Sequence, residues 1–290
     1  MNFFQGCTAL ITGASSGIGE ELAWQLAPHA HALILVARRI ERLEVMKVEL
    51  GREFPTLNVF IYGLDLRDGE LTDNFLAWLG ENNLRVNFLI NNAGHGDYGD
   101  FASGQWDRIE SMIELNVTAL TRLTHRLLPM LKSFAIGRDR LFPKTCPSIS
   151  ASILNVSSIA GFMPMPQLAV YAATKAYVTS FSEGLRVELR NTGVSVTTLC
   201  PGPVSTEFGE IAKRDPGFER ITPPGFFRVP VEQVAREALE AVARDNARVI
   251  PGWKVALGIA LLSLIPMVIL RCLLGRWNEA QEESITAINR

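Results

Sequence analysis

Residues 8–19 read Thr-Ala-Leu-Ile-Thr-Gly-Ala-Ser-Ser-Gly-Ile-Gly, a short apolar run followed by a glycine-rich turn. The apolar run predicts a buried strand, and the residues from Glu20 to Ala27 have the pattern of a helix. Glycines let the backbone approach a ligand closely, and the N–H groups and dipole at a helix N-terminus favour an anion. This order therefore predicts a site for the pyrophosphate of a dinucleotide. The alternative is that the glycines only form a tight loop.

Strand-like and helix-like segments alternate from this turn to about residue 250, with no Pro/Gly/Ser-rich linker between two halves. The 290 residues, of which 48% are hydrophobic, are ample for a substantial core. We therefore expect one domain over residues 1–252. The alternation and the right-handed crossover rule predict an α/β fold, a doubly wound sheet of seven mostly parallel strands with helices on both faces. The expected strands are residues 8–11, 32–36, 57–63, 86–90, 153–156, 194–199 and 249–250.

The predicted second strand ends in Ala37-Arg38-Arg39, where dinucleotide-binding folds place the residue that recognises the adenosine ribose. An acidic residue there would bond the ribose 2′-hydroxyl, but this chain has Ala37 followed by Arg38. The planar guanidinium of Arg38 suits a 2′-phosphate. The sequence therefore predicts that NADP(H) is preferred over NAD(H). The alternative is a solvated arginine at the start of a helix.

Three side chains that can handle protons fall between residues 157 and 175. Tyr171 and Lys175 are four residues apart, so a helix would place them on the same face. Because a nearby ammonium favours the phenolate, we expect Lys175 to lower the pKa of Tyr171 toward neutrality. Ser158 follows the apolar run 153–156, so its hydroxyl is expected where a strand ends. A tyrosine and a lysine at this spacing are also common on ordinary amphipathic helices.

The sequence around these three residues resembles the active-site region of the short-chain dehydrogenase/reductase family. The matching strings are Asn155-Val156-Ser157-Ser158-Ile159-Ala160-Gly161 and Tyr171-Ala172-Ala173-Thr174-Lys175-Ala176. The glycine turn departs from the common G-x-G-x-x-G pattern and matches the family's T-G-x-x-x-G-I-G form. The resemblance extends over about the first 250 residues. It implies a Rossmann-like fold and hydride transfer between a nicotinamide and a carbonyl or secondary alcohol of a small molecule.

The resemblance also implies roles for individual residues. Ser158 would steady the substrate oxygen, Tyr171 would exchange a proton with it, and Lys175 would also bond the nicotinamide ribose. Asn116 would hold a water that relays protons to Lys175; its alternative role is to stabilise a kink in the helix predicted over residues 105–131. The cofactor-binding residues that we expect are Gly13, Ser15, Ser16, Gly17, Ile18, Gly19, Arg38, Asp65, Asn92, Ala93, Gly94, Tyr171, Lys175, Pro201, Gly202, Val204 and Thr206.

Three of these positions have a specific expectation attached. The resemblance implies that Asp65 contacts the adenine, and the alternative is that it caps a helix N-terminus. It also implies that Val204 and Thr206 meet the nicotinamide carboxamide, whereas the alternative is an ordinary turn after a strand. His95, at the loop tip after Gly94, receives no role, because a lone histidine is more often a polar loop residue.

Two segments depart from the family or vary within it. Residues 133–150 are longer and more polar than the usual connection, which predicts a surface insertion. Residues 205–230 are irregular and rich in phenylalanine, proline and charge, where the family has its substrate lid. The phenylalanines of this lid could line an apolar pocket or could be core residues beneath a loop; they are Phe208, Phe218, Phe226 and Phe227.

Composition excludes several other classes of function. The formal net charge of −2 argues against a nucleic-acid partner held through phosphate contacts. The four cysteines are scattered without metal-ligand spacing, which predicts free thiols in a reducing compartment and no metal site. The first strand starts too early for a signal peptide, so we expect a cytoplasmic protein.

The tail has an unusual run, Val255 to Leu270, that contains no charge and is bounded by Lys254 and Arg271. We expect an apolar C-terminal helix over residues 253–275 and a polar tail over 276–290. Clear membrane spanning is not expected, because a spanning helix needs ~20 apolar residues and Pro266 would kink this one. The run could be covered by a bilayer interface, by a partner subunit of a homo-oligomer, or by the substrate pocket. We predict peripheral association with the cytoplasmic face of a membrane and, by extension, a lipophilic substrate.

A second hypothesis is a catalytically silent NADP-binding sensor or scaffold protein with the same fold. The presence of Ser158, Tyr171, Lys175 and Asn116 together argues against it, because a chain released from catalysis could have lost any of the four.

Overall fold

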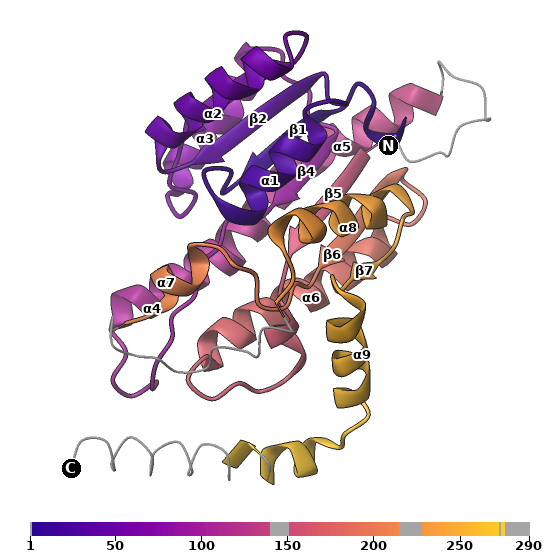
Figure 1. Ribbon diagram of the computed structural model, residues 1–290. Coiled ribbons are helices and arrows are strands. Elements are labelled where there is room, and N and C mark those ends of the chain that lie inside the picture. Colours follow the sequence, from indigo (N-terminus) through magenta and orange to yellow (C-terminus); the bar gives the residue numbers. More distant parts are fainter. Residues whose placement is uncertain (1, 140–150, 215–227, 273, 276–290) are drawn as a thin grey trace.

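Seven parallel strands form the sheet of the computed structural model, which describes residues 2–139, 151–214, 228–272 and 274–275 (Figure 1). The strand order is β3-β2-β1-β4-β5-β6-β7, and every neighbouring pair in the described residues is parallel. This confirms the predicted doubly wound architecture. The strands are β1 (Thr8–Thr12), β2 (Ala32–Ala37), β3 (Asn58–Gly63), β4 (Phe88–Asn91), β5 (Ala151–Val156), β6 (Val194–Leu199) and β7 (Arg248–Val249).

The strand order reverses between β1 and β4. From β1 the chain moves outward through β2 to β3, and it then crosses back to place β4 on the other side of β1. In the register of the sheet, Leu10 pairs with Ile34 of β2 and with Leu89 of β4. The connections after β1 and β4 leave in opposite directions, which opens a crevice at their carboxyl ends where such sheets bind ligands.

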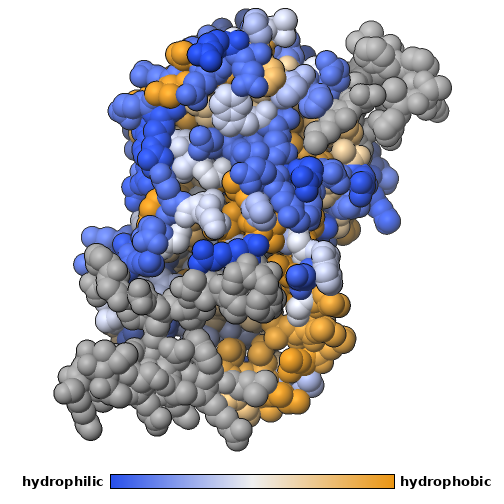
Figure 2. All heavy atoms as spheres, in the orientation of Figure 1, coloured by the Kyte–Doolittle hydropathy of each residue, from blue (hydrophilic) through white to orange (hydrophobic). Residues whose placement is uncertain are grey.

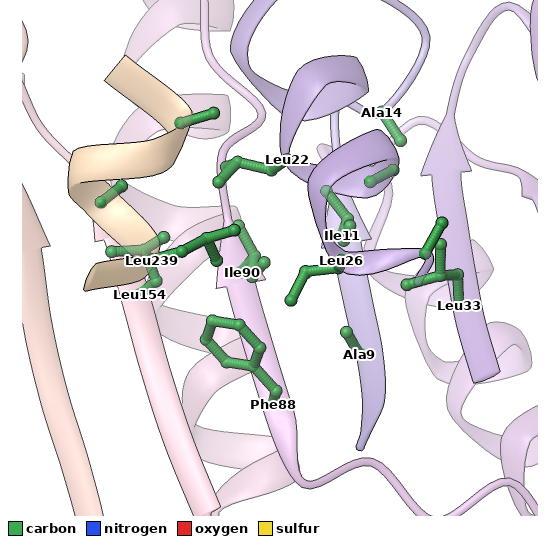
Figure 3. Close-up of a cluster of buried hydrophobic side chains, with 14 of the residues drawn as sticks. Ala9, Ile11, Ala14, Leu22, Leu26, Leu33, Phe88, Ile90, Leu154 and Leu239 are labelled. Atoms are coloured by element: carbon green, nitrogen blue, oxygen red, sulfur yellow. The ribbon is translucent and has the colours of Figure 1, made fainter. Parts of the chain in front are cut away.

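Helices cover both faces of the sheet because successive strand residues point to opposite sides. Ala9 and Ile11 pack in a cluster with α1, α2 and α8, whereas Leu10 packs in a second cluster with α3, α5 and α6. Figure 3 shows part of the first cluster, with Leu26 of α1 and Leu239 of α8 over the sheet. The helices are α1 (Gly17–Leu26), α2 (Ile40–Glu53), α3 (Gly69–Glu81), α4 (Trp106–Ile113), α5 (Leu120–Asp139), α6 (Ala169–Glu188), α7 (Phe208–Ala212), α8 (Val231–Ala243) and α9 (Trp253–Leu262).

The single helix predicted over residues 105–131 is interrupted. A π-helical turn, Glu114–Ala119, separates α4 from α5. Helix α5 continues to Asp139, so residues 133–139 of the predicted surface insertion extend this helix. No proline or glycine interrupts the sequence between Leu131, which is fully buried, and residue 136, so the helix can continue. Residues 140–150 lie outside the described part of the chain.

The predicted apolar helix over residues 253–275 is also divided. Helix α9 ends at Leu262, and the chain is helical again over residues 267–272, in a different direction (Figure 1). Pro266 lies in the break, where it lacks the N–H that would continue the helix. Among the described residues, no helix is long and apolar enough to cross a membrane. The polar tail 276–290 lies outside the described residues.

Part of the predicted lid forms a helix. Residues 208–212 form α7, so the expectation of an irregular segment is wrong there. An isolated bridge joins Val204 to Val229 and brings the two ends of the segment together. Residues 215–227, with Phe218, Phe226 and Phe227, lie outside the described residues.

Candidate active site

The glycine turn lies against the loop after β4. Gly13 and Gly17 have φ values of +66° and +60°, which favour glycine. A Cβ on Gly13 would lie 2.9 Å from the Cα of Ala93, and a Cβ on Gly19 would overlap the side-chain amide of Asn92. The glycines therefore let two loops approach at the point where the strand order reverses. Such a backbone cradle fits the pyrophosphate of a dinucleotide.

Hydrogen bonds hold these two loops together. The amide of Asn92 donates to the carbonyls of Thr12 and Gly13 at 2.9 and 3.2 Å. In return, the Thr12 hydroxyl accepts from the N–H groups of Asn92 and Ala93, both at 3.0 Å. The predicted Asn92, Ala93 and Gly94 thus flank the glycine turn. Sequence reasoning missed Thr12, although it directly precedes the first glycine.

The turn after β6 completes this edge of the sheet. The Ile159 N–H donates to the carbonyl of Pro201 at 3.0 Å, and the methyl carbon of Thr206 would lie 3.1 Å from a Cβ on Gly17. Gly202 faces Val255 of α9, whose Cγ1 would lie 3.1 Å from its Cβ. The predicted residues 201–206 therefore reach from the loop after β5 to the glycine turn.

Tyr171 and Lys175 project from the same buried face of α6, as their spacing predicts. Both side chains are less than one-tenth exposed, and the Lys175 Nζ lies 5.8 Å from the centre of the Tyr171 ring. The Lys175 Nζ donates to the carbonyl of Val156 at 2.9 Å, which ties the helix to the end of β5. Ser158, two residues after that carbonyl, caps the 3-10 turn Ile159–Phe162 by accepting from the Ala160 N–H at 3.2 Å. The structure thus brings all three predicted residues together.

Burial controls the titration of this pair. Burial raises the pKa of Tyr171 to about 12, and a hydrogen bond with Ser158 opposes that rise. Burial also lowers the pKa of Lys175 to about 8, although the charge of Cys200 works in the other direction. The expectation that Lys175 draws the pKa of Tyr171 toward neutrality is therefore wrong in this structure, because desolvation of the phenolate outweighs other contributions. Tyr171 keeps its proton at neutral pH.

Asn116 lies in the π-helical turn between α4 and α5 and is almost fully buried. Its amide nitrogen donates to the carbonyl of His95 at 3.0 Å and to the Thr174 hydroxyl at 3.1 Å, and its oxygen accepts from the His95 N–H at 3.1 Å. These bonds agree with the alternative role, a side chain that stabilises a helix distortion. A Cβ on Gly94 would lie 2.9 Å from the Asn116 oxygen and 3.4 Å from the Lys175 Nζ. The Asn116 amide and the Lys175 ammonium therefore both lie beside Gly94.

Arg39, rather than Arg38, turns toward the glycine turn. Its guanidinium donates to the hydroxyls of Ser16 at 2.7 Å and Ser15 at 3.3 Å. It also pairs with Glu207 at 2.8 Å, and Arg42 pairs with the other oxygen of that carboxylate at 2.7 Å. Arg38 is exposed, and its charge helps to lower the pKa of Asp65. Arg39, the alternative to Arg38 as the residue that recognises a 2′-phosphate, is thus the arginine bound to the predicted Ser15 and Ser16.

Asp65 does not cap a helix. Its carboxylate pairs with Arg67 at 2.6 Å, and hydrogen bonding to Arg67 holds its pKa below the ordinary value. The N-cap of α3 is Asp68, which accepts from the Leu71 N–H at 3.0 Å. The capping alternative is therefore wrong for Asp65. Its predicted contact with an adenine is not tested by these bonds.

A buried ion cluster joins the loop after β4 to the lid. Asp97 is 4% exposed and pairs with Arg108 of α4 at 2.8 Å and with Arg214 at 2.5 Å. The Tyr98 N–H donates to the carbonyl of Ala212 at 2.8 Å. This cluster fixes α7, and Phe208 of α7 lies with its ring centre 5.5 Å from that of Tyr171. Arg214 and Ala212 are more than one hundred residues from Asp97 and Tyr98 in sequence, which explains why the pattern did not reveal these contacts.

The described residues contain no group of three His, Cys, Asp or Glu side chains that could hold a metal ion.

Comparison with known proteins agrees with this geometry. The model of the short chain dehydrogenase family matches residues 7–216. Sulfoacetaldehyde reductase from Chromohalobacter salexigens is 42% identical over 207 residues, which cover 68% of this chain and 72% of that protein. Serine 3-dehydrogenase from Agrobacterium fabrum is 34% identical over 206 residues, covering 69% and 73%.

Two solved structures are also similar. A short-chain dehydrogenase from Sphingobium yanoikuyae in complex with NADPH has a TM-score of 0.72 and 32% identity, covering 90% of this chain and 96% of that one. The bulky-bulky ketone specific alcohol dehydrogenase from Comamonas testosteroni has a TM-score of 0.68 and 28% identity. That match covers 98% of this chain and 94% of the other.

Proposed function

The chain belongs to the short-chain dehydrogenase family, and we propose that it transfers a hydride between NADP(H) and a lipophilic carbonyl compound or secondary alcohol. Its relatives are dehydrogenases and reductases that act on alcohol or carbonyl groups. Solved relatives are complexes with NADPH and with NADH, which supports a nicotinamide cofactor. The close approach of Gly13 and Gly19 to the loop after β4 fits such a cofactor.

One observation supports the reaction most directly: the Tyr171 phenol and the Lys175 amine are both buried, with the Lys175 Nζ 5.8 Å from the centre of the Tyr171 ring. A bound nicotinamide supplies the hydride chemistry. Tyr171, with its pKa raised to about 12, can give its proton to a carbonyl oxygen, and Ser158 can donate a hydrogen bond to that oxygen. The Lys175 ammonium favours the negative charge left on Tyr171. Because Tyr171 is protonated in the free protein, its protonation state suits reduction of a carbonyl compound.

The preference for NADP(H) rests on the cationic cluster at the start of α2. Glu207 accepts from both Arg39 and Arg42, so this position stabilises a carboxylate, and a 2′-phosphate offers oxygens to the same donors. Ser15 and Ser16 hold the Arg39 guanidinium in place. We therefore assign to Arg39 part of the role that the sequence predicts for Arg38.

The affinities of 2′,5′-ADP and 5′-AMP, measured by calorimetry, test this preference without any turnover. Arg39→Ala should weaken the binding of 2′,5′-ADP by ~10- to 100-fold, since a charge-assisted hydrogen bond contributes ~1.5–3 kcal/mol, and should leave the binding of 5′-AMP nearly unchanged. Arg38→Ala is the matched variant, one residue away. A loss confined to Arg38→Ala would return the role to Arg38, and equal binding of both nucleotides by the unaltered protein would refute the preference.

An apolar substrate is supported by the surroundings of Tyr171. Phe208 lies against its ring, and α9 contributes Val255 to the adjacent turn at Gly202. A small anionic carbonyl compound is the second candidate. The sulfoacetaldehyde reductase relative and the two arginines on Asp97 favour it, because the cluster carries one more cation than anion. Rates of NADPH oxidation with apolar ketones and with short anionic aldehydes would distinguish the two.

The catalytic assignment is tested by Tyr171→Phe, with Tyr177→Phe on the same helix as its control. Loss of the proton donor should lower kcat by ~10²–10⁴-fold while NADPH binding stays within a few-fold. Tyr177 is partly exposed and its hydroxyl lies 3.0 Å from that of Thr121, so its variant should keep normal activity. Activity of Tyr171→Phe close to that of the unaltered enzyme would show that another group supplies the proton. NADPH binding without turnover of any substrate would favour the sensor alternative.

We also propose that the chain forms a homo-oligomer and associates with the cytoplasmic face of a membrane. Support for membrane association comes from the apolar composition of residues 253–275. Size-exclusion chromatography with light scattering measures the assembly; a mass of 32.0 kDa, that of a single chain, would contradict the oligomer.

A further inference from the structure

Helix α9 and the helical residues after it expose an unusual number of large apolar side chains. Figure 2 shows hydrophobic atoms gathered at the lower right of the molecule, where Figure 1 places α9. The exposed fractions reach 73% for Trp253 and 78% for Leu264. Folded soluble proteins rarely expose contiguous apolar patches of this kind unless something binds there. We call these residues the apolar stripe; they are Trp253, Leu257, Leu261, Leu264, Met267, Val268 and Ile269.

The apolar stripe is held in place by the opposite side of the same segment. Val255, Ile259 and Leu270 are buried. Val255 meets Gly202, and a Cβ on Gly252 would lie 2.8 Å from Val229. In α9 the exposed Trp253, Leu257 and Leu261 follow one another at intervals of four residues, which places them on one helical face. The fold therefore uses one face of α9 for its own packing and leaves the other for an external partner.

The charges beside the apolar stripe indicate what the partner is. Lys254 and Arg271 are the charged residues between positions 253 and 272, and the sequence contains no Asp or Glu from residue 246 to 278. The Lys254 ammonium lies 5.7 Å from the centre of the Trp253 ring, so cation and aromatic ring lie together at the end of the stripe. Lysine and arginine that flank an apolar surface, with tryptophan at its edge, suit the headgroup region of an anionic bilayer.

A second copy of the chain is less well matched. In a two-fold symmetric contact the same surface meets itself, so the cations of one copy would approach those of the other. Residues 246–278 contain no carboxylate to pair with them, and the Glu237 carboxylate of α8 already accepts from the Gly252 N–H at 3.1 Å, whereas anionic headgroups would supply the pairing charge. Helix α9 has ten residues and is ~15 Å long, about half of what crossing the hydrocarbon core requires. Its geometry therefore suits a helix that lies in the interface.

We propose that the apolar stripe docks on an anionic lipid surface and thereby holds the active-site edge of the sheet at that surface. Helix α9 packs on Gly202, in the turn that also carries Pro201 and Thr206, and next to Val229 at the end of the lid. Docking of α9 thus fixes the position of this turn relative to the lipid. Provided that the proposed function is correct, a lipophilic carbonyl compound reaches Tyr171 from the membrane without crossing bulk water.

Vesicle sedimentation of the full-length protein tests the docking without using the reaction. Vesicles of phosphatidylcholine alone and vesicles with phosphatidylglycerol are compared. The unaltered protein should sediment with the anionic vesicles and less with the neutral ones. Leu257→Glu/Leu261→Glu should reduce binding by at least about tenfold, because two charges enter the apolar contact. Val48→Glu/Val187→Glu is the control; these valines are 71% and 73% exposed on α2 and α6, and binding should not change.

Further measurements separate the possible outcomes. NADPH binding and circular dichroism confirm that each variant is folded, and NADPH oxidation with a water-soluble carbonyl compound should be the same in all three proteins. The proposal is overturned if the unaltered protein stays in the supernatant with both kinds of vesicle. It is also overturned if Leu257→Glu/Leu261→Glu binds the anionic vesicles as well as the unaltered protein does. If the unaltered protein does not bind vesicles but forms an oligomer that Leu257→Glu/Leu261→Glu disrupts, the partner of the apolar stripe is a second copy of the chain. Loss of turnover in every protein, with vesicle binding intact, would refute the proposed function and not the docking.

Discussion

Helices α6 and α9 both reverse the usual relation between polarity and burial, but in opposite directions. Helix α6 buries polar side chains, among them Thr174, Lys175 and Ser182, whereas α9 exposes leucines. The buried groups have partners inside the fold: the Lys175 Nζ bonds the Val156 carbonyl at 2.9 Å and the Ser182 hydroxyl bonds the Val178 carbonyl at 2.7 Å. A buried polar group must be satisfied internally, because desolvation without a partner is costly. An exposed apolar surface has no partner within the fold, so we expect a separate molecule or a lipid surface to cover it.

The largest expected effect comes from replacing the buried ammonium of α6 with an apolar chain of similar length. Lys175→Met should lower the rate of carbonyl reduction by ~10²-fold or more at pH 7, because no cation then supports the phenolate of Tyr171. The free energy of unfolding in urea should nevertheless rise by ~1 kcal/mol, since the burial cost of the charge exceeds the lost hydrogen bond to Val156. Lys254→Met on α9 is the control and should change neither quantity. A marked loss of stability in Lys175→Met would mean that the ammonium stabilises the fold.

The pH dependence of stability follows from the same burial. The pKa of Lys175 falls from 10.5 to about 8 on folding. Between these values the unfolded chain holds a proton that the folded chain has lost, so this residue makes stability rise with pH, by at most ~1.4 kcal/mol per pH unit. The stability advantage of Lys175→Met should therefore shrink between pH 8 and pH 10. The pKa of Cys200, which burial raises to about 11, works in the opposite direction, so the difference between the two proteins is the quantity to measure. A difference that stays constant over this range would contradict the lowered pKa.

A smaller effect is expected from disrupting the buried pair of Asn91 and Asn155, which lies beneath α6. Asn155 is fully buried; its oxygen accepts from the Asn91 amide at 2.8 Å and its amide donates to Ser182 at 2.9 Å. Asn155→Leu should lower the free energy of unfolding by ~1–3 kcal/mol, because polar groups of both partners lose a bond in the core. Thermal denaturation measures it, with Asn58→Leu on the exposed end of β3 as the comparison. Equal stability in both variants would show that the pair contributes nothing net.

The smallest effect on stability is expected on the exposed face of α9. Leu257→Gln removes an exposed apolar side chain from the apolar stripe, so in the absence of lipid the free energy of unfolding should change by less than ~0.5 kcal/mol. Ile259→Gln, on the buried side of the same helix, should be clearly destabilising. Chemical denaturation of the two variants makes the comparison. A large loss in Leu257→Gln would indicate that the stripe is covered within the protein, and the contrast between α6 and α9 would then fail.

Sequence alone determined what depends on local geometry. Three glycines between a strand and a helix, and a tyrosine four residues before a lysine, specify their arrangement through backbone freedom and the helical repeat. The doubly wound sheet also followed, because the alternation of elements leaves few topologies. For the same reason the family could be recognised from its motifs. The interruption at Pro266 is partly local, since the missing N–H is a property of the residue, and the sequence indicated a kink but not a separate second helix.

Tertiary structure decided the properties that depend on distant partners. The local spacing predicted a lowered pKa for Tyr171, but burial by residues from several elements raises it instead. Arg39, and not its neighbour Arg38, turns toward the glycine turn because Ser15, Ser16 and the distant Glu207 bind its guanidinium. The side of α9 that faces solvent was decided by the contact of Val255 with Gly202. Desolvation and ion pairing act through space, so a linear pattern can name the candidate groups, and only the fold sets their protonation state, their partners and their exposure.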